Sequence, residues 1–233
     1  EKGDIYATLG TFVDGAPRAS NYRYMNRYYD SISRLKEDYL SVRDYIWRWD
    51  SDWFWCSKAF YMNHAIPRFL FGKWMLRSES YWKLLRLDQK YHIADAIRKL
   101  GGEPEPLETI IQDVQIPIEN AAKFWNFFTE NIAIRPVWFC PTRSKTAADF
   151  PLYELKPDQI YVNFGFWDQV KARKDDPFYY NKVIEAEVSR LGGKKGLYSE
   201  AFYSKKDFYE LYNGKAYDVL KKKYDPSSHL KTL

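Results

Sequence analysis

A stretch of eleven residues, Tyr45–Trp55, combines side chains that often line a ligand site or an interface. Its sequence, YIWRWDSDWFW, has six aromatic residues, four of them Trp, together with one Arg and two Asp. Aromatic surface on this scale tends to be recruited to a pocket or a contact, and charges this close together need partners if they are buried. The stretch therefore predicts one wall of a site or of a domain contact. The alternative is an ordinary aromatic core whose charged groups reach the solvent.

The common catalytic and metal-binding motifs are absent from the sequence. It has no Walker A loop, no G-x-G-x-x-G and no G-x-S-x-G. With three His and no C-x-x-C pair, we expect no metal site. Cys56 and Cys140 lie in aromatic runs and are expected to be buried free thiols in a reducing compartment. Asp50 and Asp52 are two residues apart outside a predicted helix, which defines no catalytic geometry.

Length and charge limit the classes of protein further. The 233 residues suffice for one large domain or two small ones. The net charge of +5 is modest, and clusters such as Lys221–Lys223 are more typical of solvated helix faces than of nucleic-acid binding. No apolar run of about eighteen residues is present, so we expect a cytoplasmic protein with at most peripheral membrane association. Because the chain opens at Glu1 without Met and runs directly into DIYATLGTFVD, we expect a piece of a longer polypeptide.

The first hundred residues mix extended and helical patterns. Asp4–Val13 is β-rich and predicts a strand, and Tyr39–Trp49 predicts an extended segment. Asn63–Leu76 predicts a helix that either packs on a core or lies in a membrane interface, because Trp, Phe and Leu between basic residues suit both. Ser78 predicts the N-cap of a second helix, which Gly101-Gly102 end. The segment GGEPEP is the best internal boundary.

The pattern becomes regular after this boundary, and it predicts an α+β fold. The order β-α-β-β-α-β is the split βαβ, or ferredoxin-like, arrangement around an antiparallel sheet. Two C-terminal helices follow, the first opened by a capping box of Ser204 and Asp207. The predicted elements are strand 109–116, helix 119–131, strand 135–140, strand 159–167, helix 178–191, strand 196–202 and helices 204–212 and 215–224.

An ordered series of segments resembles one protein family. It begins with the spacing Y-x3-R-x-Y-x2-R-x5-F-W, filled by Tyr39, Arg43, Tyr45, Arg48, Phe54 and Trp55, and continues with PRFLFGKW, QDVQIP, RPVWFCP, YVNFGFW, GGKKGLYSEAFYSKKDFYELYNG and KKYDP. The series covers nearly the whole chain from about Tyr39 onward. It is similar to the C-terminal half of FAD-linked oxidoreductases resembling Δ24-sterol reductase, which belong to the vanillyl-alcohol-oxidase-type flavoproteins.

The resemblance implies an enzyme built of two parts. In these flavoproteins an N-terminal domain binds FAD, and a C-terminal cap domain on a ferredoxin-like sheet covers the flavin and shapes the substrate pocket. The resemblance places residues 1–233 in the cap. Within it, residues 1–100 are expected to hold an N-terminal strand, the aromatic segment and helices. Residues 108–203 are expected to form the ferredoxin-like core, and residues 204–233 the C-terminal helices. The absent FAD-binding domain would be the partner within the same polypeptide. Alone, the chain is expected to be inactive and to self-associate through the face that this domain would cover.

Candidate site residues on the sheet also follow from the resemblance. In relatives, the strand that Pro117 closes here sends polar side chains toward flavin and substrate. Alternation along this strand places Asp113 and Gln115 on one face and Gln112 on the other. We favour Asp113 as facing the site, and the alternative is a polar residue on a solvated face. Alternation likewise gives the predicted strand 159–167 a polar face, and Asn163 and Tyr161 on this face are further candidates.

Two other segments supply candidates. The K-x-L-Y-S segment stands where related oxidases place a Lys near the isoalloxazine, and Lys195, Tyr198 and Tyr203 fit this place, although the segment departs from the H-W-x-K form of sugar-lactone oxidases. Arg43, Tyr45 and Arg48 recur in the sterol-reductase-like pattern and are expected to line a substrate tunnel, with Phe54 and Trp55 packing its wall. The alternative for Arg48 is a buried ion pair with Asp50 or Asp52.

The chemistry that the resemblance implies is hydride transfer by FAD to or from a lipid-like or sterol-like substrate. The protein would position this apolar substrate and move a proton at the neighbouring carbon. A Tyr or a Lys suits that proton transfer, and no particular residue is assigned as catalytic. The competing hypothesis is a non-enzymatic module that binds a membrane surface or a partner through its aromatic surface.

Overall fold

The computed structural model describes residues 5–50, 53, 62–93, 96, 105–144 and 150–231. The chain divides into two compact units, residues 1–104 and 105–233, and each is described by itself. The expectations for Asp52, Phe54, Trp55 and Cys56, and for a helix end at Gly101-Gly102, fall outside the described residues.

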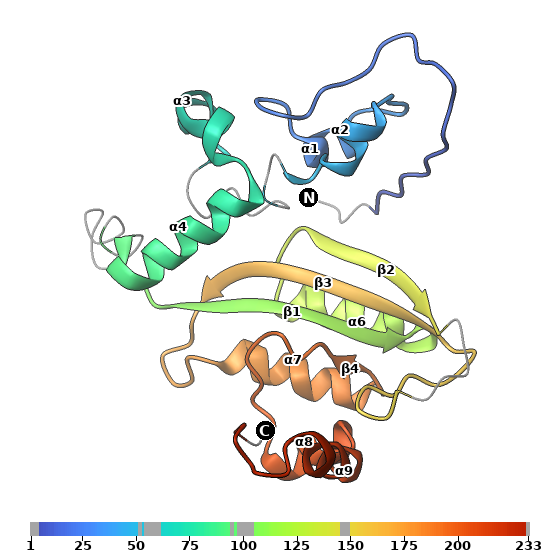
Figure 1. Ribbon diagram of the computed structural model, residues 1–233, viewed down its shortest axis with the longest axis vertical. Helices are drawn as coiled ribbons and strands as arrows, with labels where there is room; N and C mark the ends of the chain where they lie inside the picture. Colours follow the sequence, from blue (N-terminus) through green and yellow to red (C-terminus); the bar gives the residue numbers. More distant parts are fainter. Residues whose placement is uncertain are drawn as a thin grey trace. The chain divides into compact units, whose positions relative to one another are not determined.

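Helices make up the regular structure described in the first unit (Figure 1). The predicted strand over Asp4–Val13 is wrong for its described part, because residues 5–13 form no regular element and expose apolar side chains such as Leu9. This segment has strand-like composition but pairs with no strand among the described residues, and a lone strand is not stable. The helices are α1 (Tyr28–Ile32), α2 (Val42–Ile46), α3 (Ala65–Met75) and α4 (Ser78–Tyr91).

The extended segment predicted over residues 39–49 is also wrong, since it contains α2. The Oγ of Ser41 accepts a hydrogen bond from the backbone N–H of Asp44 at 3.1 Å and donates one to its carboxylate at 2.7 Å. This local capping outweighs the β-branched and aromatic composition.

The helix predicted over 63–76 is confirmed as α3. In α4, Ser78 is the first helical residue and Arg77 occupies the N-cap position, so the predicted cap is wrong. The reason is that Asp50 accepts from both the backbone N–H and the hydroxyl of Ser78, which satisfies the first turn from outside the helix.

The second unit is an antiparallel sheet with helices, and it confirms the α+β class. The strand order is β2-β3-β1-β4, and each neighbouring pair is antiparallel. The chain order matches the predicted β-α-β-β-α-β pattern. The elements are β1 (Leu107–Pro117), α6 (Ile118–Asn131), β2 (Val137–Arg143), β3 (Ile160–Lys171), α7 (Tyr179–Arg190) and β4 (Lys194–Lys195), followed by α8 (Lys205–Leu211) and α9 (Gly214–Tyr224).

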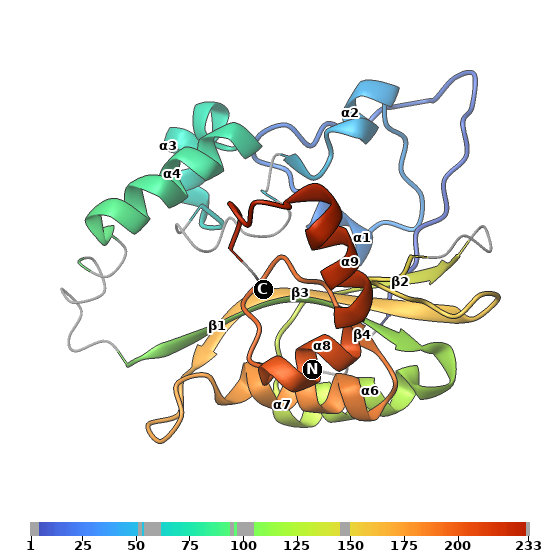
Figure 2. The ribbon, with the colours of Figure 1, turned by 60° about the horizontal axis from the view of Figure 1, so that its bottom comes forward.

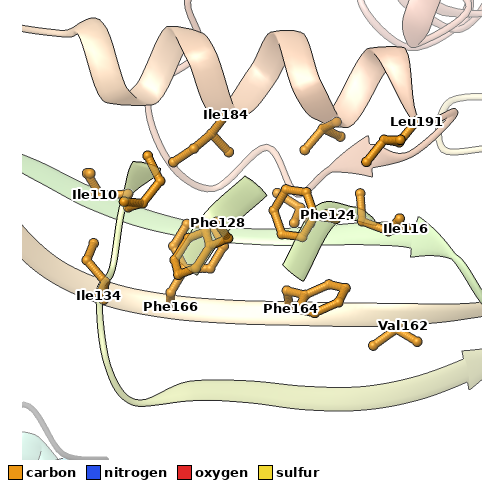
Figure 3. Close-up of a cluster of buried hydrophobic side chains, with 13 residues drawn as sticks. Ile110, Ile116, Phe124, Phe128, Ile134, Val162, Phe164, Phe166, Ile184 and Leu191 are labelled. Atoms are coloured by element: carbon orange, nitrogen blue, oxygen red, sulfur yellow. The ribbon is translucent and has the colours of Figure 1, made fainter. Parts of the chain in front are cut away.

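The core of this unit lies between the sheet and the two helices α6 and α7, which cover one face of it (Figure 2). Alternate residues of β1 and β3 point toward the helices, and Figure 3 shows the rings of α6 packed against those of β3. The ring centroids of Phe124 and Phe164 are 4.9 Å apart, and those of Phe128 and Phe166 are 4.6 Å apart. Burial of this aromatic and aliphatic surface fixes which face of each strand turns inward.

Polar residues on the helix-covered face of β1 form hydrogen bonds with α7. The carboxylate of Glu108 accepts from the backbone N–H groups of Tyr180 at 3.1 Å and Asn181 at 2.7 Å, so it caps the first turn of α7. The amide of Gln112 donates to the Asn181 side chain at 2.6 Å. The prediction that Gln112 turns away from Asp113 is therefore confirmed by the structure.

The strand predicted over residues 196–202 is wrong, because the last strand is β4, which ends at Lys195. The backbone N–H of Gly196 still donates to the Asp113 carbonyl at 2.8 Å, but Phe202 donates its N–H to the carboxylate of Glu185 on α7 instead of to the sheet. Residues 196–202 are thus a loop at the edge of the sheet, called the edge loop below. At the C-terminus, Ser204 caps α8 through Asp207 at 3.1 Å, as predicted.

Candidate functional site

The candidate site lies on the face of the sheet opposite α6 and α7, called the open face below. Because side chains alternate along a strand, the residues that do not point into the core share this face. They combine carboxylate, amide, aromatic and thiol groups. They include Ile111, Asp113 and Gln115 from β1, Asn163, Gly165 and Trp167 from β3, Trp138, Cys140 and Thr142 from β2, and Lys194 from β4.

Three of the predicted site residues meet at Asp113. One carboxylate oxygen accepts from the Asn163 amide at 2.9 Å, and the other accepts from the Tyr198 hydroxyl at 2.8 Å. Partial burial of the hydroxyl and its hydrogen bond to Asp113 raise the pKa of Tyr198 above its ordinary value. The cluster is therefore centred on a carboxylate whose two donors come from β3 and the edge loop.

A glycine makes room for this carboxylate. Gly165 lies opposite Asp113 on β3, and a Cβ at this position would stand 2.5 Å from the Asp113 Oδ1. Trp138 flanks the glycine from β2, where an added Cβ would be 3.5 Å from its own Cβ. A strand glycine of this kind marks a close approach, and here the approaching group is the carboxylate.

Lysine 194 and tyrosine 153 also border the cluster, and sequence reasoning missed both. Lys194 pairs with Gln115 and therefore shares the open face. Burial lowers the pKa of Lys194, and nearby Glu154 opposes this shift. The Tyr153 hydroxyl donates to the Lys194 carbonyl at 3.3 Å, and burial raises the pKa of Tyr153, with smaller contributions from Tyr212 and Asp113.

Two buried polar atoms on the open face have no hydrogen-bond partner among the described residues. They are the Oε1 of Gln115 and the Oγ1 of Thr142. Unsatisfied buried polar atoms are rare in native proteins and mark places where a water or a ligand completes the bonding. Cys140, on β2 in the same face, is a half-buried free thiol, which confirms the predicted free state but not full burial.

Other predicted residues lie away from this cluster. Lys195 pairs with Val114 in the sheet, so its side chain points toward the helices, where it is fully buried and bonded to Glu185 at 2.5 Å. Tyr203 is half-buried, with the Lys195 ammonium 6.0 Å from its ring centroid. Tyr161 is on the open face, but its hydroxyl is bonded to Gln159 and to the backbone N–H of Lys156.

The candidates of the first unit form a separate aromatic group. The Arg48 guanidinium lies 3.8 Å from the ring centroid of Tyr45 and donates to the Tyr45 carbonyl. Arg43 and Tyr45 are exposed, as is Trp47, whereas Trp53 is buried and donates its indole N–H to Arg77. These contacts describe a cation stacked on aromatic rings.

The described residues form neither a metal-binding cluster nor a membrane-spanning helix. Within these ranges, no three His, Cys, Asp or Glu side chains gather in a way that could hold a metal ion. None of the helices described combines the length and the apolar composition needed to cross a bilayer.

The fold and site thus define an α+β domain with a carboxylate-centred polar cluster on the open face of an antiparallel sheet. The chain is 24% identical to the Δ24-sterol reductase of Rattus norvegicus over 196 residues, which are 83% of this chain and 36% of that protein. It is 23% identical to the Homo sapiens Δ24-sterol reductase over 197 residues, 84% of this chain and 36% of the relative. A Δ24-sterol reductase homologue of Caenorhabditis elegans is 22% identical, with 94% of this chain and 42% of that protein aligned.

These similarities confirm the resemblance that the ordered segments indicated. The chain spans little more than a third of the length of the first two relatives. No protein-family model and no solved structure matches the chain.

The groups on the open face suit the ring of a flavin better than its pyrophosphate. A planar ring with a polar edge needs hydrogen-bonding groups beside flat or aromatic surface. On the open face Gly165 lies between Asp113 and Trp138, and Gln115 pairs with Lys194 farther along β1. The unpartnered oxygen of Gln115 supports a bound polar group on this face. A pyrophosphate needs a glycine-rich loop at a helix N-terminus, and the sequence has no such motif. The residues present fit the ring of the flavin and not its phosphates.

Proposed function

We propose that this chain is the substrate-binding cap of an FAD-dependent oxidoreductase, and that its open face covers the flavin ring and a sterol-like substrate. The observation that carries the proposal is the similarity to Δ24-sterol reductases over 83% of the chain. The polar cluster at Asp113 supports the proposal, because this cluster lies on the open face, and the resemblance predicts that Asp113 faces the flavin and substrate.

The chain's own residues would orient the substrate and transfer one proton. FAD, when bound, supplies the hydride chemistry. Asp113 holds the Tyr198 hydroxyl in a fixed direction, and Lys194 is the half-buried cation of the same face. Trp138 and Trp167 add flat apolar surface that would exclude water from a sterol skeleton.

The proposal predicts flavin binding by the full-length protein and none by this chain alone. The full-length protein should show flavin absorbance at neutral pH, either as purified or after reconstitution with FAD. Residues 1–233 treated in the same way are the control and should retain no flavin after gel filtration. Full-length protein that purifies without flavin and takes up none from excess FAD would overturn the proposal.

A second candidate function is favoured by the surface of α3. Its buried side carries a charge, because Arg68 is 2% exposed and donates to the Tyr24 carbonyl at 2.7 Å, whereas its outer side is apolar. Residues 62–77 contain basic but no acidic side chains. A helix of this composition suits the boundary of an anionic membrane. The exposed apolar side chains are Ile66, Phe69, Leu70, Phe71 and Trp74.

If α3 binds a membrane, the chain should co-sediment with vesicles that contain phosphatidylserine and less with pure phosphatidylcholine vesicles. The double substitution Phe69→Ser/Trp74→Ser should lower the bound fraction about tenfold, since it removes two large apolar side chains that would insert into the lipid. The matched control is Val219→Ser/Tyr224→Ser, which changes exposed apolar residues of α9. A wild-type chain that stays in the supernatant with both vesicle types would contradict this function.

A further inference from the structure

The edge loop crosses from the helix-covered side of the sheet to the open face. It begins after Lys195, whose side chain points toward the helices, and it carries Tyr198, whose hydroxyl reaches Asp113 on the open face. At its other end, the backbone N–H of Phe202 donates to both carboxylate oxygens of Glu185, at 3.1 and 3.0 Å. Both ends of the loop therefore converge on Glu185.

The ion pair between these ends is buried. The side chains of Lys195 and Glu185 are 0% and 4% exposed, and the Nζ–Oε1 distance is 2.5 Å. The Lys195 ammonium also donates to the carbonyl of Glu200, within the loop. Since desolvation offsets much of the attraction in a buried pair, its main effect is to fix geometry. Glu185 bonds to Lys195 and Phe202, and Lys195 bonds in turn to Glu200.

A tyrosine fastens the start of the loop without adding charge. The Tyr212 hydroxyl donates to the backbone carbonyl of Lys195 at 2.7 Å and accepts from its N–H at 3.3 Å. Gly196 then donates to the Asp113 carbonyl. The loop is thus held at both ends and is bonded to β1 at Asp113, the residue that Tyr198 contacts.

We propose that Glu185 and Lys195 are positioning residues, which clamp the edge loop so that the Tyr198 hydroxyl stays on Asp113 in the candidate site. That this hydroxyl serves a flavoenzyme rests on the proposed function. The positioning itself is a property of this chain and can be measured without flavin or substrate.

The chemical reactivity of Tyr198 reports its position. The residue is 59% exposed, so a reagent reaches its ring. Tetranitromethane nitrates tyrosine through the phenolate, and the hydrogen bond to Asp113 helps to raise the pKa of Tyr198 and so to lower the phenolate population. Release from Asp113 should therefore speed nitration, by about tenfold for each unit by which the pKa falls.

The experiment compares nitration rates of Tyr198 in the 233-residue chain by peptide mass spectrometry. Glu185→Gln removes the charge of the clamp and nearly keeps its shape. Glu187→Gln is the matched control, because Glu187 lies two residues away on α7 and pairs with Arg190 at the surface. Asp113→Ala removes the acceptor and gives the rate for a released Tyr198. Tyr224, an exposed residue of α9, is the internal reference.

We expect Glu185→Gln to raise the nitration rate of Tyr198 about tenfold, toward the Asp113→Ala rate, and to leave the rate of Tyr224 unchanged. Glu187→Gln should match the wild type. A folded Glu185→Gln chain with an unchanged Tyr198 rate overturns the proposal. If Glu185→Gln does not fold, Tyr212→Phe decides, because it loosens the start of the loop and buries no unpaired charge. A higher nitration rate of Tyr198 in this variant supports the proposal, and an unchanged rate overturns it.

Discussion

Lys195→Met is expected to destabilise the second unit by about 3–5 kcal/mol, because it leaves the buried carboxylate of Glu185 without its cation. Methionine keeps most of the side-chain volume, so the loss is electrostatic and not one of packing. The carboxylate would keep its two bonds from Phe202 but would lose its cation in a site with 4% exposure. Urea denaturation, followed through hydrogen exchange of the β1 amides, measures the change in the free energy of unfolding.

The control is another lysine that pairs with a carboxylate near α7. Lys182 contacts Asp176 at 2.8 Å, but its side chain is 47% exposed, so Lys182→Met should cost less than about 1 kcal/mol. The double variant Lys195→Met/Glu185→Leu should recover part of the loss, since no charge remains buried. Equal effects of Lys195→Met and Lys182→Met would show that the pair is not buried as described.

The same lysine shows where sequence reasoning reached its limit. Alternation along β1 and β3 correctly placed Asp113 and Asn163 opposite the core residues, because these strands are long enough to show a period of two. The lysine of the K-x-L-Y-S segment could not be oriented in this way, since β4 has only two residues. Its register depends on the pairing of Val114 with Lys195, and this pairing turns Lys194 to the open face.

The first unit shows a different limit. The composition of 39–49 favours an extended chain, but a short local cap at Ser41 makes a helix there. Two other residues near Asp113 gave no sequence signal. Gly165 acts by having no side chain beside Asp113, and Tyr153 reaches the site from a segment without regular structure.

The final prediction concerns Asp113, at the centre of the candidate site, and it rests on the proposed function. In the full-length flavoprotein, Asp113→Ala should lower turnover of a sterol-like substrate by about 10²-fold, the order expected when a group that positions or transfers a proton is removed. The half-buried side chain contributes little to the core, so the free energy of unfolding should change by about 1 kcal/mol or less. Steady-state kinetics and urea denaturation of the same preparations separate the two effects.

Two further variants define the role of this carboxylate. Thr109→Ala is the control, because Thr109 lies on the open face of the same strand, away from the cluster. Its hydroxyl accepts a hydrogen bond of 3.1 Å from the side chain of Gln169, its partner on β3. Asp113→Asn keeps the size of the side chain and removes the charge. If the charge is needed, Asp113→Asn should be as slow as Asp113→Ala, whereas a role limited to orienting Tyr198 would leave Asp113→Asn markedly faster, since its amide oxygen still accepts one bond. Turnover of Asp113→Ala equal to that of Thr109→Ala would remove Asp113 from the site and with it the assignment of the open face to the substrate.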